Sequence, residues 1–180
     1  MIKTKRLLLR RVRKEDWKAI QRIWKDEAVS PYAQYDNIKE LDDLSVTNRI
    51  ARWGREAEYY NHIFFAVRLQ DEIIGYISCN RCVDAYEIGY CFHSKYHGQG
   101  YAKESVLGVI AYLRDIGASR LVAGTAMKNI PSIRLLNSVG FKQVGVEKVS
   151  FYKDSEGKDI YFDGGIFELQ LGWKGEMYEN

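Results

Sequence analysis

The chain has 180 residues, 46% hydrophobic and 28% charged, with a formal net charge of +3. This globular composition excludes a disordered chain, and the length suits a single domain, 1–180, with one core. The scattered lysines and arginines give no basic face for nucleic acid. No apolar run reaches the ~18 residues that span a membrane, and the start lacks the apolar core of a secretory signal, so we expect a cytoplasmic protein.

The first third of the chain predicts one strand and two helices. Residues 6–12 are apolar at their centre, which indicates a strand. From Trp17 the large apolar residues return at helical spacing, and 30–37, which contains a proline, Tyr32 and Tyr35, is interpreted as a loop. A second helix is predicted by apolar residues at steps of four and three: Val46, Ile50, Trp53, Ala57 and Tyr60.

The middle of the chain predicts three strands. Residues 62–69 and 73–78 are rich in aromatic and β-branched side chains and flank a short polar turn, which indicates a hairpin. Residues 86–92 alternate with period two, so this strand has two distinct faces. One face carries Ile88, Tyr90 and Phe92, and the other carries Glu87, Gly89 and Cys91.

The last third predicts a helix, a strand, a helix and two strands. An apolar stripe runs from Ala102 to Ile116 and stops before a glycine, a strand is expected over 121–127, and a short helix over 129–139. Two closing strands, 141–152 and 160–171, flank a turn at 154–157. The order of elements predicts a mixed α/β sheet.

The three cysteines give no framework for a disulfide or a metal site. An odd number in a chain without an export signal argues against disulfides. Cys79 and Cys82 have redox or zinc spacing, but residues three apart in a strand point to opposite faces, so we expect the two thiols to diverge. No second cysteine pair follows, and we expect no metal.

The run His97-Gly98-Gln99-Gly100-Tyr101-Ala102 lies between a predicted strand and a strongly amphipathic helix. Glycines let a ligand approach the backbone, and free N–H groups at a helix start suit a pyrophosphate. The run lacks the Gly-Lys-Ser/Thr of a P-loop, and Lys103 stands where a dinucleotide motif needs a third small residue.

These residues resemble the GNAT acetyltransferase superfamily, whose signature is Gln/Arg-x-x-Gly-x-Gly/Ala. His97-x-x-Gly100-x-Ala102 matches two of the three positions, with histidine in place of the usual Gln or Arg. The longer string from Glu87-Ile88-Gly89-Tyr90 to Lys103-Glu104 is similar to the RimJ/RimL-type branch, which includes ribosomal-protein N-terminal acetyltransferases.

Two further stretches carry the same resemblance in the expected order. The opening Thr4-Lys5-Arg6-Leu7-x-Leu9-Arg10 is similar to the first strand of that branch. The run Asn129-x-x-Ser132-x-Arg134-x-Leu136-x-x-x-Gly140-Phe141 is similar to its last helix and the aromatic residue after it.

The resemblance implies a GNAT fold: a mixed, mostly antiparallel sheet of about seven strands with four helices, in which the strands at 86–92 and 121–127 splay apart. Acetyl-CoA, as co-substrate, would place its pantetheine arm in that gap beside the backbone of Cys91 and Phe92, with Asn129 as a hydrogen-bond partner. A backbone N–H there would polarise the thioester carbonyl. The acceptor would be an amine, either a protein N-terminus or a small molecule, and a homodimer is compatible with the family.

Acetyl transfer to an amine needs a group that takes a proton from the ammonium. Glu87 is the candidate base, because its side chain opposes the apolar face of the strand at 86–92. The alternative is that Glu87 is a solvated strand residue or holds a neighbouring backbone group. His93 and His97 are interpreted as loop histidines that shape the turn, since neither has an evident orienting partner.

The departing thiolate needs a hydrogen-bond donor. Many relatives carry a tyrosine seven residues after the asparagine, but here that position is Leu136. Ser132 is the next candidate for contact with the sulfur, although a serine in a first helical turn usually caps the helix, and capping is the interpretation we favour. Without the tyrosine, a catalytically silent acyl-CoA-binding module is the alternative function.

The aromatic residues divide between core and surface. Tyr32 and Tyr35 lie in the loop that covers the acceptor site in the family, with surface packing as the favoured interpretation. The others are expected to build the core: Trp53, Tyr59, Tyr60 and Phe64.

Overall fold

The computed structural model describes residues 1–37, 39–56 and 61–172, and in this part of the chain eight strands form one sheet. Their spatial order is β1-β2-β3-β4-β5-β6-β8-β7. The strands are β1 Ile2–Lys3, β2 Leu7–Arg11, β3 His62–Leu69, β4 Glu72–Arg81, β5 Tyr86–Phe92, β6 Arg120–Ala126, β7 Lys142–Lys153 and β8 Asp159–Gln170. Neighbours are antiparallel except β5 and β6, which are parallel. The predicted mixed, mostly antiparallel sheet is confirmed, and the additional strand is the two-residue β1, which is too short to show a period.

Four α-helices are present in the described residues, as predicted. They are α1 Trp17–Ala28, α2 Asp43–Glu56, α3 Tyr101–Asp115 and α4 Ile130–Ser138. Three short 3-10 helices accompany them: η1 Lys14–Asp16, η2 Ala33–Tyr35 and η3 Ser94–Tyr96. Three positions assigned to the second helix or to the core lie outside the described residues: Ala57, Tyr59 and Tyr60.

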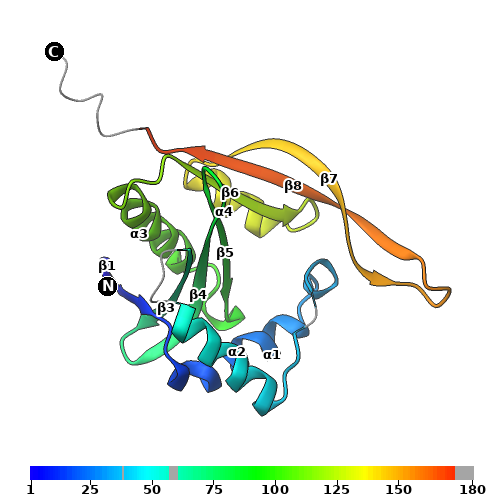
Figure 1. Ribbon diagram of the computed structural model, residues 1–180, viewed down its shortest axis with the longest axis horizontal. Coiled ribbons are helices and arrows are strands. Elements are labelled where there is room, and N and C mark those ends of the chain that lie inside the picture. The colour runs from blue at the N-terminus through cyan, green and yellow to red at the C-terminus, as the bar shows by residue number, and fades with distance from the viewer. Residues whose placement is uncertain (38, 57–60, 173–180) are drawn as a thin grey trace.

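The helices cover both faces of the sheet, with α1 and α2 on one side and α3 and α4 on the other (Figure 1). The larger core lies under α3 and α4 and includes Ile88 and Phe92 of β5. The smaller core lies under α1 and α2, with Cys91 packed against it. The alternation predicted for 86–92 is therefore confirmed, because alternate side chains of β5 pack into the larger core while Cys91 faces the smaller core and Glu87 is exposed.

Two further sequence patterns have clear structural outcomes. Cys79 is buried in the larger core while Cys82 is exposed, so the two thiols diverge as expected. The hairpin of β7 and β8 runs out beyond the rest of the molecule (Figure 1). The end of β7, next to the turn of the hairpin, flanks the loop that contains η2, since the Tyr152 hydroxyl donates to the Ala33 carbonyl oxygen at 3.2 Å.

Candidate active site

The glycine turn before α3 leaves room for a ligand against the backbone. Gly98 and Gly100 have φ angles of +72° and +79°, a left-handed conformation that glycine adopts readily. A Cβ at Gly98 would meet no atom within 4 Å. Gly100 is the N-cap of α3 and has no side chain with which to cap it. The first N–H groups of α3 and the positive end of its dipole therefore suit an anion such as a pyrophosphate.

Arg6 holds this turn from the segment before β2. Its Nη1 donates to the Gln99 carbonyl oxygen at 3.0 Å, and its guanidinium carbon lies 4.4 Å from the centre of the Tyr101 ring. Its Nε pairs with Glu104 Oε2 at 2.7 Å, and Glu104 Oε1 also accepts from the Thr4 hydroxyl at 2.6 Å. Burial raises the pKa of Glu104, but the hydrogen bonds from Thr4 and Arg6 outweigh it and lower that pKa overall. The network fastens the start of α3 to the N-terminal segment.

Both loop histidines have partners, contrary to expectation. His97 Nε2 lies 2.8 Å from the Phe92 carbonyl oxygen, so this nitrogen must carry a proton to donate. His93 Nδ1 accepts from the Lys95 N–H at 3.3 Å and lies 3.6 Å from Asp26 Oδ2. The expectation was wrong because the partners are a carbonyl of β5 and a carboxylate of α1, which local sequence does not place nearby. Both contacts shape the turn, as the loop-histidine interpretation requires.

The neighbouring strands β5 and β6 separate soon after they meet. Their parallel pairing consists of Tyr86 with Leu121 and Glu87 with Val122, at the start of both strands. The splayed pair expected from the family resemblance is therefore present. From residue 88 onward β5 faces a gap on its β6 side.

Backbone alternation decides which groups of β5 face this gap. β5 pairs with β4 in one continuous antiparallel register, and the His93 N–H extends it by donating to the Ile74 carbonyl oxygen at 3.0 Å. Because backbone groups alternate in such a ladder, the N–H of Cys91 points to β4 and that of Phe92 points to the gap. Of the two backbone positions expected beside a pantetheine arm, Phe92 is thus the one with an N–H available.

Glu87 lies at the closed end of the gap. It is exposed on the face of the sheet that carries α1 and α2, opposite Asn80 of β4. It precedes Cys91 by four residues on the same face, roughly 13 Å at the usual rise of a strand. The position is compatible with both interpretations, a base at the gap and a solvated strand residue.

Ser132 does not cap α4. Asn129 is the N-cap, and its Oδ1 accepts from the Ser132 N–H at 3.2 Å. The Ser132 hydroxyl instead lies 2.9 Å from the Tyr90 phenol oxygen. The preference for a capping serine was wrong because an asparagine three residues earlier already fills that role. Burial raises the pKa of Tyr90 to about 12, so the phenol stays protonated at neutral pH.

The position at which many relatives carry a tyrosine is closed to the site. Leu136 is fully buried in the larger core, beside α3 and the last strands. The hydroxyl groups at the start of α4 are therefore those of Tyr90 and Ser132. Sequence analysis assigned no role to Tyr90. The signal that could have identified it is its place on the apolar face of β5, the face that packs toward α4.

On the face of the sheet that carries α1 and α2, some aromatic residues build the core and others join the loop of η2 to the hairpin of β7 and β8. Trp53 stacks on buried Phe64 with ring centres 4.3 Å apart, as predicted for core residues. Tyr35 of η2 meets Phe162 of β8 edge-on, with ring centres 5.3 Å apart. The loop that contains η2 therefore contacts the hairpin of β7 and β8, next to the end of β6.

The described residues contain neither a metal-binding cluster nor a membrane-spanning helix. Within 1–37, 39–56 and 61–172, no group of three or more His, Cys, Asp or Glu side chains is arranged to hold a metal ion. No helix in the same ranges is both long and apolar enough to cross a membrane.

Comparison with known proteins agrees with this geometry. The family described as acetyltransferase (GNAT) domain matches residues 6–142. The uncharacterized N-acetyltransferase YnaD of Bacillus subtilis is 30% identical over 164 residues, which cover 89% of this chain and 94% of that protein.

Two solved structures show the same fold. The ribosomal-protein-S5-alanine acetyltransferase of Vibrio fischeri has a TM-score of 0.80 at 18% identity and covers 96% of this chain and 97% of its own. The Salmonella typhimurium acetyltransferase that modifies the N-terminal serine of L7/L12 has a TM-score of 0.81 at 17% identity, with 94% and 97% covered. The chain belongs to the GNAT family and is an acetyl-CoA-dependent N-acetyltransferase.

Proposed function

We propose that this protein acetylates a primary amine, either a protein N-terminus or a small molecule, by direct attack of the amine in a ternary complex. The observation that carries the proposal is the gap between β5 and β6, which opens beside the glycine turn on one side and the loop of η2 on the other. Two enzymes of similar fold are named for ribosomal-protein substrates, which supports keeping the N-terminal amine as an acceptor class.

The residues of the turn would hold acetyl-CoA by its phosphates. Gly98, Gln99 and Gly100 are exposed, Tyr101 and Ala102 are half-buried, and Arg6 brings a positive charge to Gln99 and Tyr101. The N–H of Phe92 would hydrogen-bond the cofactor in the gap. Cys91, whose side chain lies on the opposite face of β5, would line the cofactor site beside it. The side-chain oxygen of Asn129 is occupied by the cap of α4, so its amide NH₂ is the group free for the pantetheine arm.

Bound acetyl-CoA supplies an acetyl group activated as a thioester. In the transfer, the amine nitrogen forms a bond to the acetyl carbon, the carbon–sulfur bond breaks, the nitrogen loses a proton and the sulfur gains one. We assign the first proton to Glu87 through a chain of several waters, because its side chain lies at the closed end of the gap, roughly 13 Å along β5 from Cys91. We assign the contact with the departing sulfur to the Ser132 hydroxyl, which Tyr90 positions at 2.9 Å.

The test is release of free thiol from acetyl-CoA by the purified protein with a panel of amines, with the acetylated product identified by mass spectrometry. Direct attack predicts that initial-rate plots for the two substrates intersect, and that no acetylated protein accumulates when the amine is omitted. A covalent acetyl-protein formed without an amine would contradict the ternary mechanism. Acetyl-CoA binding without turnover on any amine would make the protein a silent binding module.

A further inference from the structure

Gly124 of β6 is a strand glycine that the fold does not require. Four glycines of the described strands have a steric reason, because a Cβ would come within 3.0 Å of a side-chain atom: Gly75, Gly89, Gly164 and Gly165. Gly145 lies in β7 where the register with β8 shifts. At Gly124 the φ angle is not positive, and a Cβ would meet no atom within 4 Å. Glycine weakens a strand, and a strand glycine of this kind is typical of a place where a ligand approaches the backbone.

Gly124 borders the gap on its β6 side. The last pair of β5 with β6 is Glu87 with Val122, and Gly124 follows Val122 by two residues. Ala123 points into the larger core, so Gly124 faces the side of the sheet that carries α1 and α2, where it is exposed. Because Glu87 lies on the same face beside Val122, Gly124 is the next position of β6 along the gap from the proposed base.

The same face of β6 leads on to a cavity. Ala126, two residues beyond Gly124, lines a cavity of about 640 Å³ between the end of β6, η2 and the hairpin of β7 and β8. Its walls include the rings of Tyr35 and Phe162, which meet edge-on. The Asn129 N–H donates to the Ala126 carbonyl oxygen at 2.8 Å, so this end of β6 also contacts the residue that we assign to the pantetheine arm. Gly124 thus lies between the closed end of the gap and a cavity beside the cofactor.

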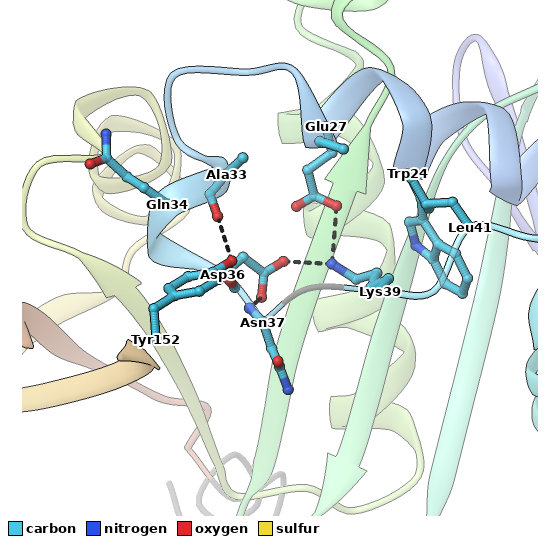
Figure 2. A pocket seen from close by; sticks show the side chains of 10 residues that line it. Trp24, Glu27, Ala33, Gln34, Asp36, Asn37, Lys39, Leu41 and Tyr152 are labelled. Atoms are coloured by element: carbon cyan, nitrogen blue, oxygen red, sulfur yellow. Dashed lines mark hydrogen bonds and ion pairs between the residues drawn. The ribbon is translucent and has the colours of Figure 1, made fainter. Parts of the chain in front are cut away.

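On the α1 side, the charged and polar groups are already paired with one another. The Lys39 ammonium lies 3.1 Å from Glu27 Oε2 and 2.6 Å from Asp36 Oδ2, and Figure 2 shows it between the two carboxylates. The Tyr152 hydroxyl hydrogen-bonds the carbonyl oxygens of Ala33 and Asp36. These contacts hold the loop of η2 in place without a ligand. The β6 side, at Gly124, is where the fold leaves space next to the gap.

Building on the proposed function, we infer that Gly124 determines the size of the acceptor: the group next to the reacting amine lies over the bare backbone of β6 at this residue. A side chain at position 124 would project into that space without disturbing its neighbours. Cofactor binding should be spared, because the phosphates bind at the turn before α3 and the Phe92 N–H belongs to β5. The effect of added bulk should therefore fall on the acceptor.

Conjugates of coenzyme A with an amine test this placement without knowledge of the natural acceptor. In each conjugate the sulfur of coenzyme A carries –CH₂–CO–NH–R, where R is methyl, isobutyl or benzyl. The cofactor part supplies affinity, and R takes the place of the acceptor. Binding to the wild type, Gly124→Ala and Gly124→Val is measured by calorimetry, with coenzyme A as the reference.

The expected result is a loss of affinity that grows with R. Gly124→Val should bind coenzyme A and the methyl conjugate as the wild type does, and the benzyl conjugate roughly tenfold more weakly, since overpacking of this size is typical for an added side chain. Gly124→Ala should show a smaller loss in the same order. The melting temperature should not fall, because valine favours a strand.

Gly145→Val is the matched control. Gly145 and Gly124 both pair with Ile166 of β8, so the two glycines lie in one row across the sheet, with Gly145 on the far side of β8 from the gap. A Cβ at Gly145 would make only ordinary contact with Ile166, at 3.5 Å. This variant should bind every conjugate as the wild type does.

Three results would overturn the inference: wild-type binding of the benzyl conjugate by Gly124→Val, equal loss of affinity for coenzyme A and all conjugates, or failure of the wild type to bind the benzyl conjugate. Thiol release from acetyl-CoA by the wild type would still support acetyl transfer. If valine lowers the melting temperature, Gly124→Ala decides, because selective loss of the benzyl conjugate upholds the inference and wild-type binding contradicts it. Selective loss without thiol release on any amine would uphold the placement and refute the proposed reaction.

Discussion

The Tyr90 phenol oxygen lies 2.9 Å from the Ser132 hydroxyl oxygen, so β5 and α4 meet through a pair of hydroxyl groups at the edge of the gap. The pKa of Tyr90, raised to about 12 by burial, keeps the phenol protonated at neutral pH. This pair supplies a hydrogen-bond donor, which the buried, apolar side chain of Leu136 cannot do.

Ser132→Ala should lower kcat about 10²-fold, at the lower end of the range for loss of a proton donor, because the departing sulfur loses its contact. The melting temperature should hardly change, since the serine hydroxyl does not cap the helix. Tyr90→Phe retains the ring and the serine, so kcat should fall less than in Ser132→Ala. Normal turnover in Ser132→Ala would remove the serine from the mechanism.

Asn129→Ala should cost about 1 kcal/mol of unfolding free energy, because the first turn of α4 loses the acceptor of the Ser132 N–H. Asn129→Asp keeps an acceptor and should restore the stability, but it removes the amide NH₂ that we assign to the pantetheine arm. Urea denaturation and acetyl-CoA binding therefore separate the two roles. If both variants bind acetyl-CoA as the wild type does, Asn129 serves only the helix.

Gly100→Val should weaken acetyl-CoA binding at least tenfold, about 1.4 kcal/mol, because a side chain would block the backbone of the turn. Gly100 has a φ of +79°, so some stability is lost as well. Gly117→Val is the matched control, because Gly117 has a φ of +91° after α3, at the other end of the helix. It should lose stability and keep its affinity. Equal loss of affinity in both variants would point to strain in α3 instead of contact with the cofactor.

The order of the elements was predictable because each long segment has a clear period. The residues of β5 alternate between the larger core and the opposite face of the sheet, and α3 and α4 end before glycines, so local pattern was enough for these. The strand β1 has two residues and shows no period at all.

The partners of the site residues were less predictable, because they come from distant parts of the chain. Arg6 reaches Gln99 across 93 positions, and Asp26 reaches Ser94 across 68. The role of Ser132 depended on a choice between two candidate caps three residues apart, Asn129 and Ser132, and on the direction of the Tyr90 side chain. Helical spacing decides neither. The glycine turn itself was visible because positive φ angles restrict the residue type.

The last prediction concerns Glu87, where removal of the base can be separated from loss of binding. Glu87→Gln keeps the size of the side chain, so acetyl-CoA affinity and stability should stay at wild-type values. At neutral pH kcat should fall by about 10²–10⁴, the range for loss of a general base. Raising the pH should restore part of the rate, because more of the amine arrives deprotonated, and more completely for an N-terminal amine of pKa ~7.7–8.0 than for an alkylamine near ~10.4.

The matched control is Glu15→Gln, which removes an exposed carboxylate far along the chain from the gap and should leave kcat unchanged at every pH. A structural glutamate at position 87 would instead give lower stability or weaker binding, with no selective recovery at high pH. Wild-type turnover of Glu87→Gln at pH 7 with an identified acceptor would exclude it as the base. Deprotonation would then pass to solvent or to another carboxylate on the same face of the sheet.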